Sequence, residues 1–158
     1  MNNDIRKRWI AALTHGRYTQ CAHKLRKVED GKETFCALGV LCNLYIEEND
    51  DARWDPHFPG LVAYEEDDSE TKFADGELPY TVRDWADLES ISGPFFTVGK
   101  AKRILPDKTP EFWATTIDGI ATSKYITHNQ NDMLINIPRL NDAGATFEDI
   151  ALVLKNVP

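Results

Sequence analysis

The chain has 158 residues, of which 42% are hydrophobic and 28% are charged, and its formal net charge is −8 at neutral pH. This length and composition are typical of one folded domain and exclude a disordered chain, and no apolar stretch reaches the roughly 20 residues that cross a bilayer. General binding of nucleic acid is not expected from so acidic a chain, because contacts with phosphate dominate that affinity.

The cysteines and the first residues predict a cytosolic protein. The chain has three cysteines, an odd number, and two of them lie in one apolar run. This favours reduced thiols over a disulfide framework. Residues 1–4 lead directly into an amphipathic pattern, so we expect no secretory signal.

The first predicted element is a helix at residues 4–15. Ile5, Trp9 and Leu13 recur at helical spacing and form its apolar face. Gly16 follows in the position where a left-handed residue often ends a helix.

A basic segment comes next, at residues 17–28, and predicts an extended piece that turns at residues 30–31. Behind Tyr18, three basic side chains alternate with apolar ones and form a candidate site for the phosphate of a nucleotide. These residues are Lys24, Arg26 and Lys27. A solvated strand face is the alternative interpretation.

The run Phe-Cys-Ala-Leu-Gly-Val-Leu-Cys-Asn-Leu-Tyr at residues 35–45 is the longest apolar stretch of the chain. Its alanine and leucine content favours a helix at residues 35–46, with Thr34 as the cap. A helix that is apolar on all sides lies in the centre of a fold. Gly39, inside this helix, predicts the close approach of another backbone segment.

The middle of the chain is strongly acidic: residues 47–89 hold fifteen acidic and three basic residues. Short strands at residues 60–64 and 71–74 are expected to form a hairpin there. Trp54 lies among charges and is a candidate anchor for a partner. The carboxylates expected beside it are Glu65, Glu66, Asp67 and Asp68. A solvated acidic loop is the alternative.

In the second half of the chain, the sequence pattern predicts helices at residues 79–88, 110–120 and 146–156. It also predicts a strand at residues 95–98. The pattern at residues 125–137 fits either a strand or a loop. The predicted fold is therefore a compact α+β domain that spans residues 1–158. The central helix lies among the other helices, and a small, mainly antiparallel sheet covers one side.

Five segments occur together along the chain. The first three are Arg6 with Trp9, the stretch Gly-Arg-Tyr-Thr-Gln that begins at Gly16, and the apolar run at residues 35–45. The last two are Leu-Pro-x-x-Val-x-x-Trp, which begins at Leu78, and Leu-Asn-Asp-Ala-Gly-Ala-Thr-Phe-Glu-Asp-Ile-Ala, which begins at Leu140. This set resembles a widespread family of small proteins of tailed bacteriophages and prophages. The resemblance implies a phage accessory protein in the host bacterial cytoplasm. It implies no reaction.

A thiol nucleophile is the main enzymatic alternative. Cys36 is expected at a helix N-terminus, which lowers the pKa of a thiol, and His128 is the candidate base of a hydrolase or transferase. Asn129, Asn131 or Asp132 would orient that base, and Gln20 would donate to an oxyanion. Against this, cysteines in an apolar helix are usually core residues.

Metal and cofactor sites are not expected. Cys21, His23, Cys36 and Cys42 are the potential ligands, but the last two point about 120° apart on a helix. Asn141 and Asp142 admit two interpretations, catalytic carboxylate chemistry or the closing of a turn.

The residues and the resemblance together predict a protein that acts by binding. Residues 1–32 carry eight basic and three acidic residues, in contrast to the acidic middle, and such separation of charge steers encounters between macromolecules. We expect a host protein as the partner, bound to counter a defence system. A nucleotide-binding sponge is the alternative.

Overall fold

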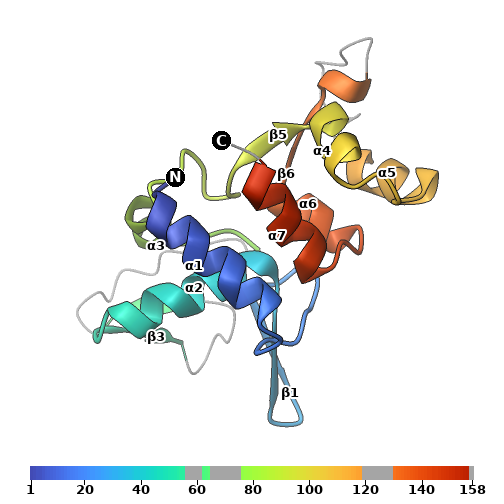
Figure 1. Ribbon diagram of the computed structural model, residues 1–158. Helices are drawn as coiled ribbons and strands as arrows, with labels where there is room; N and C mark the ends of the chain where they lie inside the picture. Colours follow the sequence, from blue (N-terminus) through green and yellow to red (C-terminus); the bar gives the residue numbers. More distant parts are fainter. Residues whose placement is uncertain (56–61, 65–75, 119–129, 157–158) are drawn as a thin grey trace.

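The structure, a computed structural model, describes residues 1–55, 62–64, 76–118 and 130–156. Its helices are α1 (Asn3–Thr14), α2 (Ala37–Glu48), α3 (Tyr80–Trp85), α4 (Val98–Ile104), α5 (Pro110–Ile117), the short 3-10 helix η1 (Gln130–Asp132), α6 (Ile137–Asp142) and α7 (Phe147–Asn156). Its strands are β1 (Arg26–Glu29), β2 (Lys32–Phe35), β3 (Ala52–Trp54), β4 (Val62–Tyr64), β5 (Phe95–Thr97) and β6 (Leu134–Asn136). The predicted compact α+β architecture is confirmed (Figure 1).

Helix α2 forms the centre of the molecule, as predicted. Eight of its twelve residues are buried, and α1, α3 and α6 pack directly against it. The helix begins at Ala37, with Cys36 in the N-cap position, because strand β2 continues through Phe35. The predicted start at residue 35 with Thr34 as the cap is therefore wrong.

The close approach expected at Gly39 is confirmed. A Cβ atom at this position would lie 1.7 Å from the carbonyl oxygen of Leu25, which is part of the segment leading into β1. The N–H of Cys36 donates to that same oxygen at 3.2 Å. The basic segment is therefore fixed against the first turns of the central helix by backbone contact.

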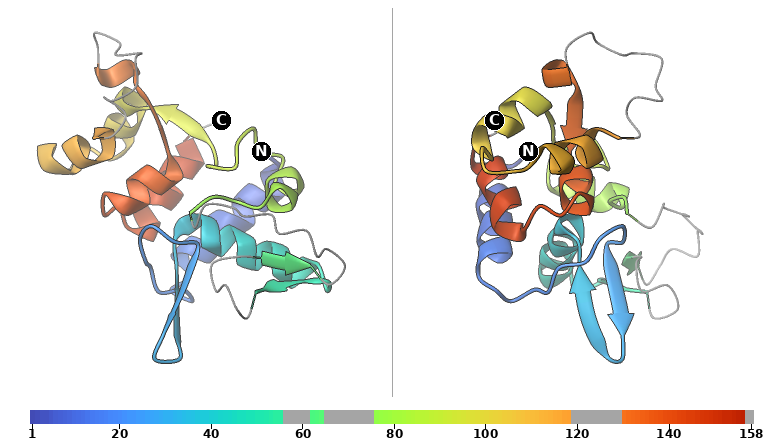
Figure 2. Two further views of the ribbon diagram at one scale, coloured as in Figure 1. Left: turned by 180° about the vertical axis from the view of Figure 1, so that it is seen from behind. Right: turned by 90° about the vertical axis from the view of Figure 1, so that its right-hand side faces the viewer.

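The described strands form three separate antiparallel pairs, β1–β2, β3–β4 and β5–β6, in place of the single small sheet expected. Strand β4 falls within the predicted strand at 60–64 but pairs with residues 52–54, and the predicted partner at 71–74 lies outside the described residues. The β1–β2 hairpin turns at Asp30 and Gly31, as predicted, and both have positive φ angles, 51° and 74°. It extends away from the helices in both views of Figure 2.

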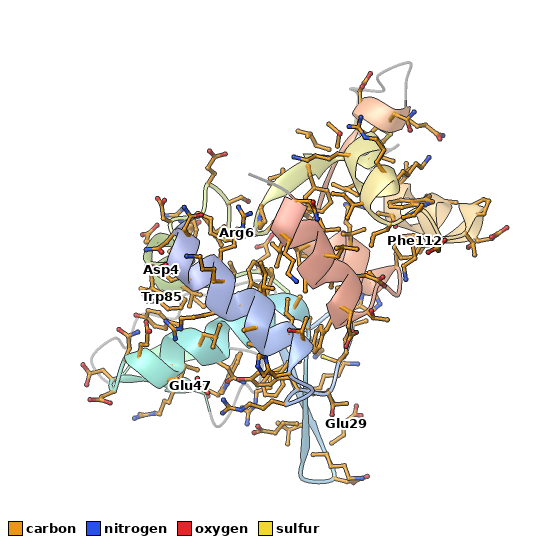
Figure 3. All side chains as sticks on the ribbon, in the orientation of Figure 1. Asp4, Arg6, Glu29, Glu47, Trp85 and Phe112 are labelled. Carbon is orange, nitrogen blue, oxygen red and sulfur yellow. The ribbon has the colours of Figure 1, made fainter. Side chains whose placement is uncertain are left out.

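Helices α1 and α7, from opposite ends of the chain, pack side by side (Figure 1). Ile5, Trp9 and Leu13 are all buried on α1, as its spacing predicts. Figure 3 shows Arg6 on this helix, and its Nη2 donates to the carbonyl oxygen of Lys155 at 3.2 Å. The longest helices of the described chain have twelve residues, and among them none is long and apolar enough to cross a membrane.

Candidate functional site

A buried amide joins the first part of the chain to its last part. The side chain of Asn141, in α6, is only 3% exposed. Its Nδ2 donates to the carbonyl oxygen of Cys21 at 2.8 Å, and its Oδ1 accepts from Gln20 Nε2 at 2.9 Å and from the N–H of Ala37 at 3.3 Å. The Ala37 N–H is one of the free donors in the first turn of α2. Asn141 therefore caps the central helix from a distant segment.

These bonds decide two roles that the sequence left open. Gln20 Nε2 also donates to the carbonyl oxygen of Ala145 at 2.8 Å, so both of its N–H groups are engaged inside the fold and neither is free for an oxyanion. Asn141 satisfies backbone groups of distant segments, which is a structural role other than the closing of a local turn.

Beside this amide, Asp142 holds His23 at two points. The carboxylate Oδ1 accepts the backbone N–H of His23 at 2.8 Å, and Oδ2 lies 3.1 Å from its ring Nδ1. His23 has a φ of 67°, which is uncommon for a residue other than glycine and occurs often at functional sites. A neutral ring held in this way donates from Nδ1, so that Nε2 is left as an acceptor. The side chain is 73% exposed.

His23 and Asp142 form part of the wall of a pocket of about 470 Å³. Five chain segments meet there: the loop before β1, the residues before α3, the loop before β5, helix α5, and α6 with its flanking residues. The lining residues are His23, Gly76, Glu77, Ser92, Thr115, Asn136, Pro138, Arg139, Asp142 and Ala143. The volume falls within the roughly 300–1,000 Å³ of small-molecule sites.

Several polar groups of this pocket keep hydrogen-bonding capacity. Arg139 donates one Nη1 N–H to the carbonyl oxygen of Asp118 at 2.8 Å, and Asn136 Oδ1 accepts from the N–H of Arg139 at 3.2 Å. Within the described part of the chain, the Glu77 carboxylate, Asn136 Nδ2 and the other guanidinium N–H groups have no hydrogen bond or ion pair. The wall thus offers both donors and acceptors.

Cys36 is placed at the N-terminus of α2, as predicted, but it is only 5% exposed. Burial raises the pKa of its thiol from the ordinary 9.0 to about 12, and the nearby backbone N–H groups of Gly39 and Leu38 offset only part of this effect. Cys36 is therefore not the activated nucleophile that the sequence suggested. Its candidate base, His128, lies outside the described residues, as does Asn129.

The candidate phosphate strip does not form one site. Arg26 makes an ion pair with Glu33, and its guanidinium lies over the ring of Trp54, 5.4 Å from the centroid. Lys27 is the next residue of β1, so it points to the opposite face of the hairpin. Lys24 precedes the strand and is exposed. The three cations therefore do not converge on a single phosphate.

Trp54, the predicted anchor for a partner, is half-buried and packs within the fold. Its Nε1 donates to Asn43 Oδ1 at 2.6 Å, and its ring centroid lies 6.0 Å from that of Phe35. These contacts do not favour an exposed anchor. The four carboxylates predicted beside it, Glu65, Glu66, Asp67 and Asp68, lie outside the described residues.

For metal binding, the described side chains hold no group of three or more His, Cys, Asp and Glu that could ligate an ion. Cys42 is fully buried in α2, and Cys21 is half-buried, with its Sγ 3.5 Å from the carbonyl oxygen of Lys24.

Sequence reasoning missed the pocket. It noted His23 and Asp142 singly and gave no role to Glu77, Ser92 or Arg139. His23 and Asp142 are 119 residues apart, so no local spacing could pair them. The one available signal was the Asn-Asp dipeptide in α6, whose two side chains bind the same distant loop.

The fold and the site define a small α+β domain with a pocket beside α6. The whole chain, residues 1–158, matches the family described as a domain of unknown function, DUF8296, and the protein belongs to that family. No curated protein and no solved structure matches the chain significantly. The family description assigns no activity.

Proposed function

We propose that this protein is a phage-encoded accessory protein that binds a small polar molecule of the host bacterial cytoplasm in the pocket beside α6. The observation that carries the proposal is the meeting of five chain segments around about 470 Å³, with polar groups not all engaged. The phage origin and a role against a host defence system are supported by the sequence resemblance alone.

The backbone conformation and the side-chain contacts of His23 support a binding role for the pocket over a purely structural one. A left-handed backbone at a residue other than glycine is held at a free-energy cost of roughly 1–3 kcal/mol. Asp142 offsets that cost with two contacts, and the result is an oriented imidazole that is largely exposed.

The two alternatives fit the geometry less well. A thiol enzyme needs a thiolate, and the pKa of Cys36 is raised to about 12 by burial. A nucleotide sponge needs converging cations, whereas Arg26 is paired and Lys27 faces away from it. A host protein bound at the acidic middle stays a prediction.

The proposal is tested by recovering what the protein binds in a host lysate. Tagged protein is isolated under native conditions, and small molecules released by denaturation are identified by mass spectrometry. The comparison is with Ser92→Trp, in which a large side chain fills the pocket. Thr14→Trp, a change at an exposed hydroxyl residue at the end of α1, is the control.

We expect one or more compounds to be enriched on the wild type and on Thr14→Trp and absent from Ser92→Trp. The same compounds on all three proteins, or none on the wild type, would overturn the proposed site. A host protein that is retained by Ser92→Trp and lost when the carboxylates at 65–68 are changed to Ser would favour the acidic segment instead.

A further inference from the structure

We infer that the ligand of this pocket is an uncharged molecule with a vicinal diol, such as a sugar ring or the ribose of a nucleoside, and that the Glu77 carboxylate accepts hydrogen bonds from the diol. The inference rests on the proposed function, because it names the class of ligand for the same pocket. Three features of the wall lead to it.

The first feature is the charge of the wall. Glu77 and Asp142 are carboxylates and Arg139 is a guanidinium, so these three side chains carry one negative charge in excess at neutral pH. A phosphate group would meet two carboxylates and one cation, which disfavours nucleotides and other polyanions. A cation would in turn meet Arg139 beside the carboxylates. An uncharged ligand avoids both repulsions.

The second feature is the mixture of donors and acceptors. Glu77 accepts, Asn136 Nδ2 and the remaining N–H groups of Arg139 donate, and the Ser92 hydroxyl does both. A hydroxyl group also donates and accepts, so a ligand with several hydroxyls can satisfy both kinds of group. A ligand with carbonyl oxygens alone would leave the carboxylate of Glu77 without a donor.

The third feature is that the two carboxylates of the wall differ in their hydrogen-bond partners. Asp142 directs both oxygens to His23. Within the described part of the chain, Glu77 has neither a hydrogen bond nor an ion pair, so both of its oxygens are available. Two oxygens of one carboxylate match two neighbouring hydroxyl hydrogens, and in dinucleotide-binding folds a single acidic residue accepts a hydrogen bond from a ribose hydroxyl. Asp142 thus orients His23, and Glu77 receives the ligand.

The test measures binding by the shifts of backbone amide NMR signals of the whole protein. The probes are ribose, uridine, 2′-deoxyuridine and uridine 5′-monophosphate, which separate a free sugar from a nucleoside and a neutral ligand from an anion. The variant is Glu77→Gln, which keeps the size of the side chain and removes its charge. The matched control is Glu29→Gln on the projecting hairpin (Figure 3).

We expect ribose, uridine or both to shift the signals of pocket residues such as Ser92 and Ala143. Removal of one hydroxyl in 2′-deoxyuridine, or of the charge in Glu77→Gln, should weaken binding about tenfold or more. Glu29→Gln should bind as the wild type does, and the monophosphate should bind no more tightly than uridine.

Equal binding of uridine and 2′-deoxyuridine, or tighter binding of the monophosphate, would overturn the diol inference and leave the pocket as a binding site. The inference also fails if a lysate compound of another class shifts the pocket signals while the four probes do not. If neither the probes nor any lysate compound shifts these signals, the proposed function itself fails.

Discussion

Two residues far apart in the sequence, Cys36 and Asn141, lie at the N-terminus of the central helix and have different roles there. Cys36 occupies the N-cap position but makes no capping hydrogen bond with its side chain, and the N–H of Ala37 is satisfied by Asn141. The Cys36 thiol is buried in the core. This arrangement explains how a cysteine can stand at a helix N-terminus and have a raised pKa.

The first prediction concerns the reactivity of Cys36. With a pKa of about 12, the thiolate is roughly one part in ten thousand at pH 8, so native protein treated with iodoacetamide should stay unlabelled at Cys36. Labelling at Cys36 should become rapid after unfolding in urea. Mass spectrometry of peptides reads both states, and Cys21, which is half-buried, reports on the reagent. Fast native labelling at Cys36 would contradict the burial described here.

The raised pKa of Cys36 also predicts how the stability of the protein changes with pH. The folded pKa of Cys36 lies above the ordinary value of 9.0, so the folded state holds the proton more tightly than the unfolded chain. The stabilisation is fully present below about pH 9 and is lost as the pH rises towards 12. We expect the urea midpoint to fall over this range, and to fall less steeply in Cys36→Ala.

A second prediction concerns the ring of His23. Asp142 accepts from Nδ1 in the wild type, so nitrogen-15 NMR at a pH where the ring is neutral should show the proton on Nδ1. In Asp142→Asn the amide can present its N–H₂ to that nitrogen, and the proton should move to Nε2. His15, whose ring Nδ1 bonds to the Ala11 carbonyl in α1, is the internal control. A proton on Nε2 in the wild type would show that the pair is not formed.

At the scale of the element, the contact between Gly39 and Leu25 fixes how the basic segment meets α2. The helix presents bare backbone where the Leu25 carbonyl approaches, and no larger residue fits without moving one of them. The sequence showed that some backbone would come near Gly39, because a glycine inside an apolar helix otherwise weakens it. The sequence did not show which segment of the chain would contact Gly39.

The third prediction follows from this contact. Gly39→Ala raises intrinsic helix propensity by about 1 kcal/mol, but the new Cβ would lie 1.7 Å from the Leu25 oxygen. Overpacking costs about 1–3 kcal/mol, occasionally more, so we expect a net loss of stability in urea unfolding. Gly76→Ala, with its Cβ 3.3 Å from the His23 carbonyl oxygen, should cost less. An unchanged or raised midpoint for Gly39→Ala would contradict the contact.

The elements differ in how well the sequence predicted them. Helices α1, α2 and α7 have ten to twelve residues and show several turns of apolar spacing. Helix α4 has seven residues and α6 has six, and each begins directly after a strand, so periodicity had too short a window to detect them. The strands have three or four residues each, and their pairing depends on contacts far apart in the chain.

At the scale of the whole molecule, segments from the two ends of the chain contact each other and the start of the central helix. Helix α1 packs against α7, and Asn141 binds Gln20, Cys21 and Ala37 at once. A sequence can show that the centre is apolar, but it does not reveal a bond between residues 121 positions apart. The pocket escaped prediction for the same reason, since its wall comes from five segments.

The fourth prediction tests this long-range joint. Asn141→Leu keeps the branching of the side chain at Cγ but leaves the Gln20 amide, the Ala37 N–H and the Cys21 carbonyl without their partner. Each unsatisfied buried group costs roughly 1–3 kcal/mol, so the free energy of unfolding should fall by about 3 kcal/mol or more. Asn156→Leu, at the exposed end of α7, should change it by about 0.5 kcal/mol or less. Similar values for the two variants would contradict the role of Asn141.

The capping of α2 by Asn141 has a consequence for protein synthesis. The Ala37 N–H leaves the ribosome 104 residues before its acceptor, which at about 5–20 residues per second is a delay on the order of 5–20 seconds. During that interval the most apolar segment of the chain is made without its cap and without α7 to cover α1. We expect nascent chains that stall before α6 to depend on chaperones, and the completed chain to be released from them.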